Sequence, residues 1–192
     1  NEPGYYCNLG NSYLILEKYE EAMTAFTAAI MLNSSDASYY CGLGHSYHES
    51  EQYVKAIPKF KKAIQLDPNE AIYHYFLGNA YLNSEQYAEA IKAYEEAIQI
   101  NPRNGLALNN LGATYLEVEQ YADAIIAYKA AIQVEPNEAI CHYNLGEAYD
   151  ALENYSEAVC AYKEALRLDP NDDEYRTSLV TAQKKCRRFA KR

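Results

Sequence analysis

The stretch that decides the fold is Ala71–Asn104, AIYHYFLGNAYLNSEQYAEAIKAYEEAIQINPRN, because close variants of it fill most of the chain. Its glycine belongs to a series that returns every 34 residues: Gly10, Gly44, Gly78, Gly112 and Gly146. A leucine precedes each of these glycines, and a tyrosine follows three residues later. A fixed period of this length indicates a repeat architecture in which every copy is one small structural unit.

The copies are compared most easily when the glycine is counted as position 8 of each repeat. The five copies are then residues 3–36, 37–70, 71–104, 105–138 and 139–172. Every copy also has tyrosine at position 17, alanine at positions 20 and 27, and an aromatic residue at position 24. Such spacings of three and four residues predict two amphipathic helices per copy. A single copy cannot bury both of its apolar faces, so the copies must stack on one another.

This pattern resembles the tetratricopeptide-repeat (TPR) consensus over about nine-tenths of the chain. The resemblance implies an all-α fold, a right-handed superhelical solenoid of antiparallel helix pairs. It also implies a protein–protein interaction scaffold, not an enzyme, which binds an extended or helical peptide segment in its concave groove without a cofactor. Two alternatives stay open: a self-assembling structural module, and the substrate-presenting arm of a larger enzyme.

The tail, residues 173–192, breaks the repeat but keeps a helical stripe that includes Tyr175 and Leu179. We expect a capping helix with a polar outer face, which covers the last repeat. The tail carries seven basic residues against Asp173 and Glu174, a net charge of +5 in a chain whose total is −10. The tail is therefore basic and the repeats are strongly acidic.

The composition excludes several classes of function. An excess of negative charge disfavours a nucleic-acid binder, which needs a basic face. No apolar stretch approaches the roughly 20 residues that span a bilayer, so we expect no membrane insertion. The five cysteines show no disulfide framework, which favours free thiols and a cytoplasmic protein. The chain starts almost directly in repeat sequence, so we expect it to be part of a longer protein.

The family resemblance also implies where a partner binds. In TPR proteins, positions 2, 5, 6, 9, 12 and 13 of the first helix line the groove, and helical geometry places these positions on one face. The candidate groove residues are Asn8, Asn11, His45, Ile72, Tyr75, Phe76, Asn79, Leu82, Asn109, Asn110, Leu116, Tyr143, Asn144 and Glu147. None of the thirty groove positions holds lysine or arginine. The chain therefore lacks the features of the subclass that clamps the C-terminal carboxylates of heat-shock chaperones.

The groove residues predict the chemistry of the partner. The middle of the groove is apolar and aromatic, whereas Glu117, Glu147 and Asp150 make its far end acidic. We therefore expect a protein or peptide with hydrophobic anchors and with basic residues toward the fifth repeat. Asparagines at position 6 resemble the asparagine ladder of O-linked GlcNAc transferase, although Gly42 and Phe76 interrupt the series. An amide both donates and accepts, which suits pairing with a peptide backbone.

Cys41, His45 and His48 form a candidate metal-binding set, because their spacing places them on one helix face. No CxxC or HxxxH pair supports a metal site, so we predict none.

The N-terminal end of the chain also suggests self-association. The first helix has no preceding helix to cover Tyr5, Leu9 and Tyr13, so we expect weak dimerisation through the N-terminal end at high concentration.

A proline and three asparagines give local predictions about where helices begin. Pro58 falls inside an expected second helix, where it removes a backbone hydrogen bond, so we expect a kink or a later helix start. Asn69, Asn137 and Asn171 follow the closing prolines and are candidate N-caps of the next helices.

Overall fold

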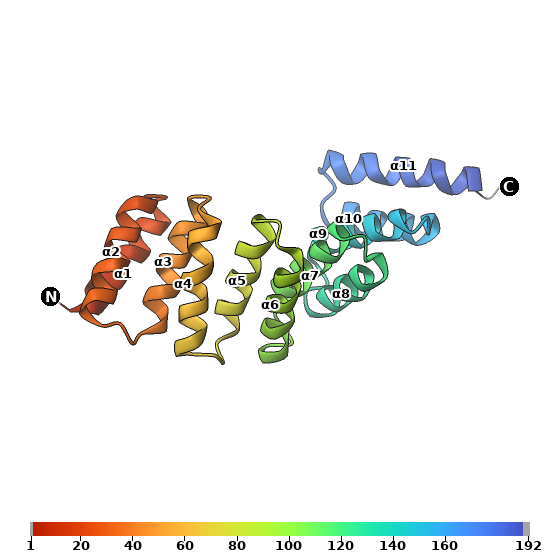
Figure 1. Ribbon diagram of the computed structural model, residues 1–192. Helices are drawn as coiled ribbons and strands as arrows, with labels where there is room; N and C mark the ends of the chain where they lie inside the picture. Colours follow the sequence, from red (N-terminus) through yellow and green to blue (C-terminus); the bar gives the residue numbers. More distant parts are fainter. Residues whose placement is uncertain (1, 190–192) are drawn as a thin grey trace. The chain divides into compact units, whose positions relative to one another are not determined.

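The computed structural model describes residues 2–189, and in this range it consists of eleven α-helices without any β-strand (Figure 1). The helices are α1 (Pro3–Ile15), α2 (Tyr19–Leu32), α3 (Ala37–Glu49), α4 (Tyr53–Leu66), α5 (Ala71–Asn83), α6 (Tyr87–Ile100), α7 (Gly105–Glu117), α8 (Tyr121–Val134), α9 (Ala139–Ala151), α10 (Tyr155–Leu168) and α11 (Asp173–Phe189). The all-α prediction is confirmed.

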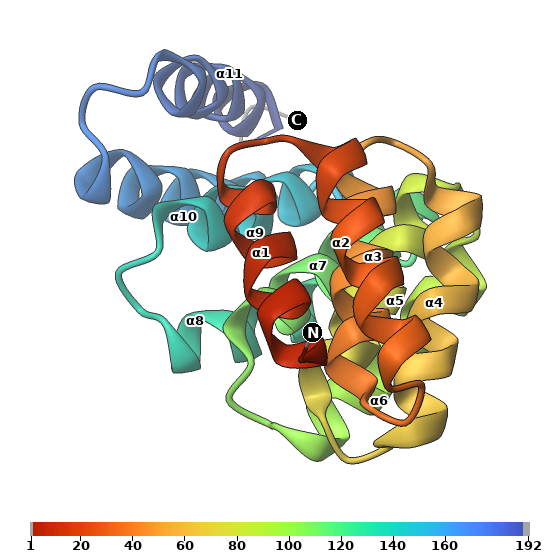
Figure 2. The ribbon, with the colours of Figure 1, turned by 90° about the vertical axis from the view of Figure 1, so that its left-hand side faces the viewer.

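The helices form two compact units, Asn1–Pro102 and Arg103–Arg192, which we call the N-terminal and the C-terminal unit. Within the N-terminal unit, α1 packs on α2, α3 on α4 and α5 on α6. Figure 2 shows α1 and α2 as adjacent antiparallel helices at the start of this unit. The C-terminal unit repeats the scheme with α7 on α8 and α9 on α10, and it ends with α11 on α10. The predicted helix pairs are therefore confirmed, and we propose to keep the five repeat boundaries given above.

The repeated glycine is explained by a close approach between the two helices of each pair. A β-carbon added to Gly78 would lie 2.6 Å from Cε1 of Tyr94, the aromatic residue at position 24 of the same copy. In the fifth copy, a β-carbon on Gly146 would meet the ring of Tyr162 at the same distance. Because real carbon atoms do not approach so closely, any side chain at this position would force the helices apart.

A feature that the sequence reading missed lies in the turn between the two helices of each copy. Position 15 holds a glutamate with φ between 56° and 61° in all five copies: Glu17, Glu51, Glu85, Glu119 and Glu153. In the third copy, the Glu85 N–H donates to the Leu82 carbonyl and the Gln86 N–H donates to the Tyr81 carbonyl, both at 2.9 Å. This pair of bonds is the Schellman motif, in which the left-handed position usually belongs to glycine.

The later helix start expected at Pro58 does not occur, whereas a kink there stays a prediction, and the expected N-caps are wrong. Helix α4 begins at Tyr53, as the equivalent helices begin at their own tyrosines, and it continues through Pro58 without a later start. The asparagines after the closing prolines are not N-caps, because Glu70 and Glu138 precede α5 and α9. At α11, the Asp172 carboxylate caps the helix, since its Oδ1 accepts from the Glu174 and Tyr175 N–H groups at 2.8 and 2.9 Å. The predicted caps therefore lie one residue too early.

Helix α11 covers the last helix pair, as the tail analysis predicts. Its buried residues Tyr175, Leu179 and Ala182 pack in one cluster with Tyr162 of α10 and Tyr143 of α9. Residues 190–192 of the expected helix, which include Lys191 and Arg192, lie outside the described range. Among the helices that the structure describes, none is long and apolar enough to cross a membrane.

Candidate functional site

In the N-terminal unit, three of the predicted groove residues form one aromatic surface. The ring of Phe76 on α5 stacks on His45 of α3, with centroids 4.8 Å apart, and on the buried ring of Phe60 at 5.7 Å. Tyr75 lies beside Phe76, at 5.5 Å. We call His45, Tyr75, Phe76 and the exposed Ile72 the aromatic face. Its rings are half-buried, so part of each ring stays accessible while its neighbours hold it in place.

Hydrogen bonds orient the polar residues around the aromatic face. The Tyr94 hydroxyl donates to Oδ1 of Asn79 at 2.7 Å. Nε2 of His48 lies 2.9 Å from the amide nitrogen of Asn83, while its Nδ1 lies 3.0 Å from a Glu49 carboxylate oxygen. Because the amide nitrogen can only donate, Nε2 of His48 accepts from Asn83, which ties α3 to α5 beside the aromatic face. Burial lowers the pKa of His45, so the face carries no strong positive charge.

The remaining candidates of this unit lie on α1 and α5. Asn8 and Asn11 are exposed on α1, where the Asn11 amide lies 3.9 Å from Sγ of Cys7. Leu82 is half-buried on α5. The structure also explains one interruption of the asparagine series. A β-carbon at Gly42 would lie 2.3 Å from the Phe26 ring, so no side chain fits at this position.

In the C-terminal unit, the predicted asparagines join in a row of side-chain amides. Nδ2 of Asn144 on α9 donates to Oδ1 of Asn109 on α7 at 3.0 Å. Nδ2 of Asn109 then approaches Oδ1 of Asn110 at 3.4 Å. Leu116 is half-buried on the same helix, α7. The amides are therefore oriented by each other, which leaves fixed donors and acceptors on this face.

The expectation that Tyr143 faces a ligand does not agree with the structure. Its side chain is 7% exposed, because the ring of Tyr175 on α11 stacks over it with centroids 4.8 Å apart. The hydroxyl donates to carboxylates of Glu147 and Glu174 at 3.2 and 3.0 Å. Position 5 is open to a ligand only where no later helix covers it, and α11 covers it here. Tyr143 is a core residue that joins α9 to α11.

The acidic end of the predicted groove is also less available than the sequence suggests. Asp150 forms an ion pair with Lys185 of α11, so the basic tail neutralises part of the acidic surface. Glu147 is half-buried, and burial is the main cause that raises the pKa of its carboxyl. Glu117 remains exposed. The expected site for a basic partner residue at the fifth repeat is therefore largely occupied by the protein's own side chains.

The candidate metal-binding residues do not form a site in the structure. Cys41 is 9% exposed, and burial raises the pKa of its thiol to about 12, which disfavours the thiolate that binds metal. Residues 2–189 contain no group of three or more histidine, cysteine, aspartate or glutamate side chains that could hold a metal ion. All five cysteines are free.

Family models of the tetratricopeptide repeat match the chain at residues 71–104 and 104–171, and a model described as TPR repeat matches residues 10–50 and 44–85. No curated protein sequence matches the chain.

Solved structures of TPR proteins are similar to this chain over most of its length. A crystal structure of MamA is 26% identical with a TM-score of 0.79, covering 84% of this chain and 94% of that one. YrrB, described as a TPR protein with an unusual peptide-binding site, is 25% identical with a TM-score of 0.76, covering 93% and 90%. MamA from Desulfovibrio magneticus RS-1 is 23% identical with a TM-score of 0.82, covering 90% and 98%, which shows the fold alone. The repeat period, the stacked helix pairs and these matches show that the chain belongs to the tetratricopeptide-repeat family.

Proposed function

We propose that this protein binds a segment of a partner protein, with the aromatic face as its main contact surface. The fold is that of a protein–protein interaction scaffold. The observation that carries the proposal is the cluster of His45, Tyr75 and Phe76, whose rings contact one another and are only half-buried. The similarity to YrrB, whose description includes a peptide-binding site, supports the same reading.

The aromatic face would supply most of the binding energy. Aromatic residues near the centre of an interface are frequent hot spots, and truncating one costs about 2 kcal/mol of binding. The oriented amide of Asn79, in the same unit as the aromatic face, would pair with the backbone of the segment, which gives a hydrogen bond without selecting a sequence. The partner is therefore a peptide segment with hydrophobic anchors. Segments ending in paired carboxylates would bind poorly, because the groove positions hold no lysine or arginine to balance their charge.

The proposal is tested by selecting binders from a phage-displayed peptide library and measuring the affinity of the strongest one by calorimetry. Two matched variants compare the aromatic face with an exposed surface outside it. Ile72→Ser changes an exposed isoleucine of the aromatic face, and Ile126→Ser makes the same change on α8, outside it. We expect the first variant to weaken binding about tenfold and the second to leave it unchanged. Equal effects of both variants would contradict the proposal.

A second candidate function is self-association through α1. Tyr5 is 64% exposed, whereas Tyr39 and Tyr73, at the same repeat position, are 7% and 9% exposed. Helix α1 contains no charged residue, so a second copy of this acidic chain can approach it without like-charge repulsion. We expect a weak dimer that a sedimentation experiment detects at high concentration. The Tyr5→Glu variant would then stay monomeric, and a wild-type protein that stays monomeric would refute this candidate.

No observation bears on the two remaining expectations, a role as the arm of a larger enzyme and a cytoplasmic location. Both stay predictions.

A further inference from the structure

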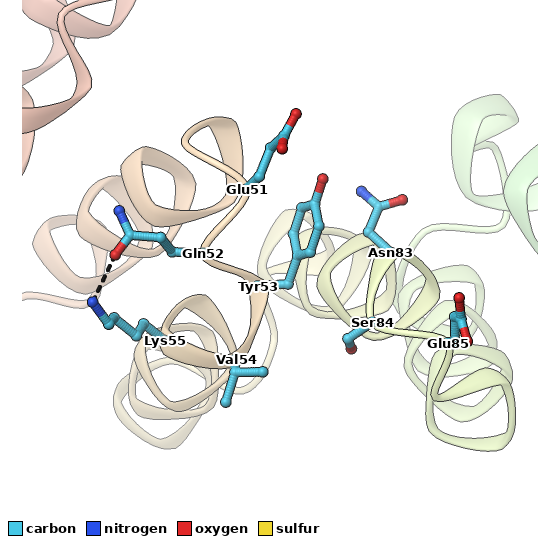
Figure 3. A pocket seen from close by; sticks show the side chains of 8 residues that line it. All are labelled: Glu51, Gln52, Tyr53, Val54, Lys55, Asn83, Ser84 and Glu85. Atoms are coloured by element: carbon cyan, nitrogen blue, oxygen red, sulfur yellow. Dashed lines mark hydrogen bonds between the residues drawn. The ribbon is translucent and has the colours of Figure 1, made fainter.

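A pocket of about 500 Å³ lies in the N-terminal unit between two successive helix turns (Figure 3). One wall comes from the α3–α4 turn and the start of α4, with Glu51, Tyr53 and Val54. The other wall comes from the α5–α6 turn, with Asn83 and Glu85. We call this site the edge pocket. Its size lies within the range of small-molecule and side-chain binding sites.

The edge pocket has an aromatic centre. Figure 3 shows the Tyr53 ring standing between Glu51 and Asn83. The ring is only partly buried, and its orientation is held by an edge contact with His48, whose centroid lies 5.3 Å away. Val54, which is 75% exposed, adds apolar surface at the start of α4. An aromatic ring with apolar surface beside it favours a ligand that has both a flat or cationic group and a carbon stem.

The charges around this ring are unbalanced. Glu51 and Glu85 are exposed, and neither carboxylate forms an ion pair with any residue in the described range. Lys55 also lines the pocket, where its Nζ donates to Gln52 at 2.7 Å and lies 5.8 Å from the centre of the Tyr47 ring. Its one positive charge stands against the two negative charges of Glu51 and Glu85, which leaves the pocket with an excess of negative charge. The pocket therefore presents an aromatic ring in a negative field, without an internal cation over that ring.

We infer that the edge pocket binds a basic side chain, arginine or lysine, of the partner segment. The cationic head would lie over the Tyr53 ring, an arrangement that contributes both a cation–π contact and attraction to the carboxylates. The methylene stem would cover Val54. This inference deepens the proposed function and rests on it for the identity of the ligand as part of a protein. It also moves the basic anchor from the fifth repeat to the N-terminal unit.

The position of the pocket fits a ligand that also uses the aromatic face. Asn83 lines the pocket and is hydrogen-bonded to His48, which lies one turn along α3 from His45 of the aromatic face. A segment bound at the aromatic face therefore reaches the pocket without leaving α3 and α5. The acidic residues of the C-terminal unit are less available to a basic side chain, because Asp150 is already paired with Lys185.

The test titrates the ¹⁵N-labelled protein with Nα-acetyl-arginine amide and follows amide shifts by NMR. The neutral isostere Nα-acetyl-citrulline amide serves as the ligand control. We expect saturable shifts at Val54 and Ser84 with the arginine probe and none with citrulline. Glu51→Gln and Glu85→Gln should each weaken binding about threefold, the effect of one exposed ion pair. Glu17→Gln is the matched variant, because it changes the same turn position outside the pocket, and it should change nothing.

The inference is overturned if citrulline binds as well as arginine, if no saturable shift occurs at the pocket, or if Glu17→Gln weakens binding as much as Glu85→Gln. The same variants separate this inference from the proposed function. If the selected peptide binds and the arginine probe does not, only the edge pocket is refuted. If the arginine probe binds and Ile72→Ser leaves peptide affinity unchanged, only the role of the aromatic face is refuted.

Discussion

Replacing Glu119 with glycine is expected to stabilise this protein, although glycine usually weakens a fold. Glu119 lies in the turn between α7 and α8 with φ of 59°, in the left-handed region. Its N–H donates to the Leu116 carbonyl at 3.0 Å, and the Gln120 N–H donates to the Tyr115 carbonyl at 2.8 Å. This motif fixes the left-handed conformation, so the glutamate cannot relax out of it without losing both bonds.

The magnitude follows from two opposing effects. A residue with a β-carbon costs about 1–2 kcal/mol in the left-handed conformation, and glycine removes that cost. Glycine also gives the unfolded chain more conformational freedom, which offsets about 0.4–1 kcal/mol of the gain. The side chain of Glu119 is exposed, so the substitution removes no buried contact. The net stabilisation is about 0.5–1 kcal/mol, or a rise of roughly 1–4 °C in the melting temperature for a chain of this size.

Urea and thermal unfolding followed by circular dichroism measure this gain. Glu119→Ala is the matched control, because it removes the carboxylate but keeps the β-carbon. We expect the alanine variant to show no gain. The reasoning is refuted if the glycine variant is less stable than the wild type, or if the alanine variant is stabilised to the same extent, since relief of charge repulsion would then be the cause.

Three further substitutions test the packing and the electrostatics. Gly78→Val should destabilise the protein by about 1–3 kcal/mol in urea unfolding, because the new side chain meets the buried Tyr94 ring, and an unchanged stability would contradict the close approach. Leu179→Ala should cost about 2–5 kcal/mol and speed amide exchange in α11, whereas unchanged exchange would show that α11 does not depend on this contact. Burial raises the pKa of Glu147 above its ordinary value of 4.5, so the folded state holds this proton more tightly and loses stability as the pH rises through that raised pKa. Glu147→Gln should therefore gain stability relative to wild type as the pH rises above the ordinary value of 4.5 and through the raised pKa, and a difference that stays constant as the pH rises would disprove the assignment.

The fold was predictable from the sequence because the repeated residues are the ones that packing selects. Glycine at position 8, with the ring of position 24 against it, leaves almost no freedom in how the two helices of a pair meet. The buried alanines, such as Ala90 and Ala97, recur for the same reason. Helix bounds therefore repeat with the period of the sequence, in Ala37–Glu49 and Ala71–Asn83 for example.

The candidate site was less predictable, because it depends on contacts between residues far apart in the sequence. Tyr143 is at a groove position, and only the placement of Tyr175 over it makes it a core residue. Asp150 looks like a free acidic residue until Lys185, 35 positions later, is seen to pair with it. The glutamates at position 15 gave no signal, since glutamate is an ordinary surface residue and its left-handed backbone is visible only in the structure.

The central claim, that partners bind on the first helices of the repeats, is tested most directly by the NMR footprint of a selected peptide. Chemical-shift changes on the ¹⁵N-labelled protein at saturating peptide locate the binding surface without relying on a substitution. The account predicts that the largest changes fall on α3 and α5, around Phe76 and His45. A footprint confined to the second helices, α4 and α6, would contradict it.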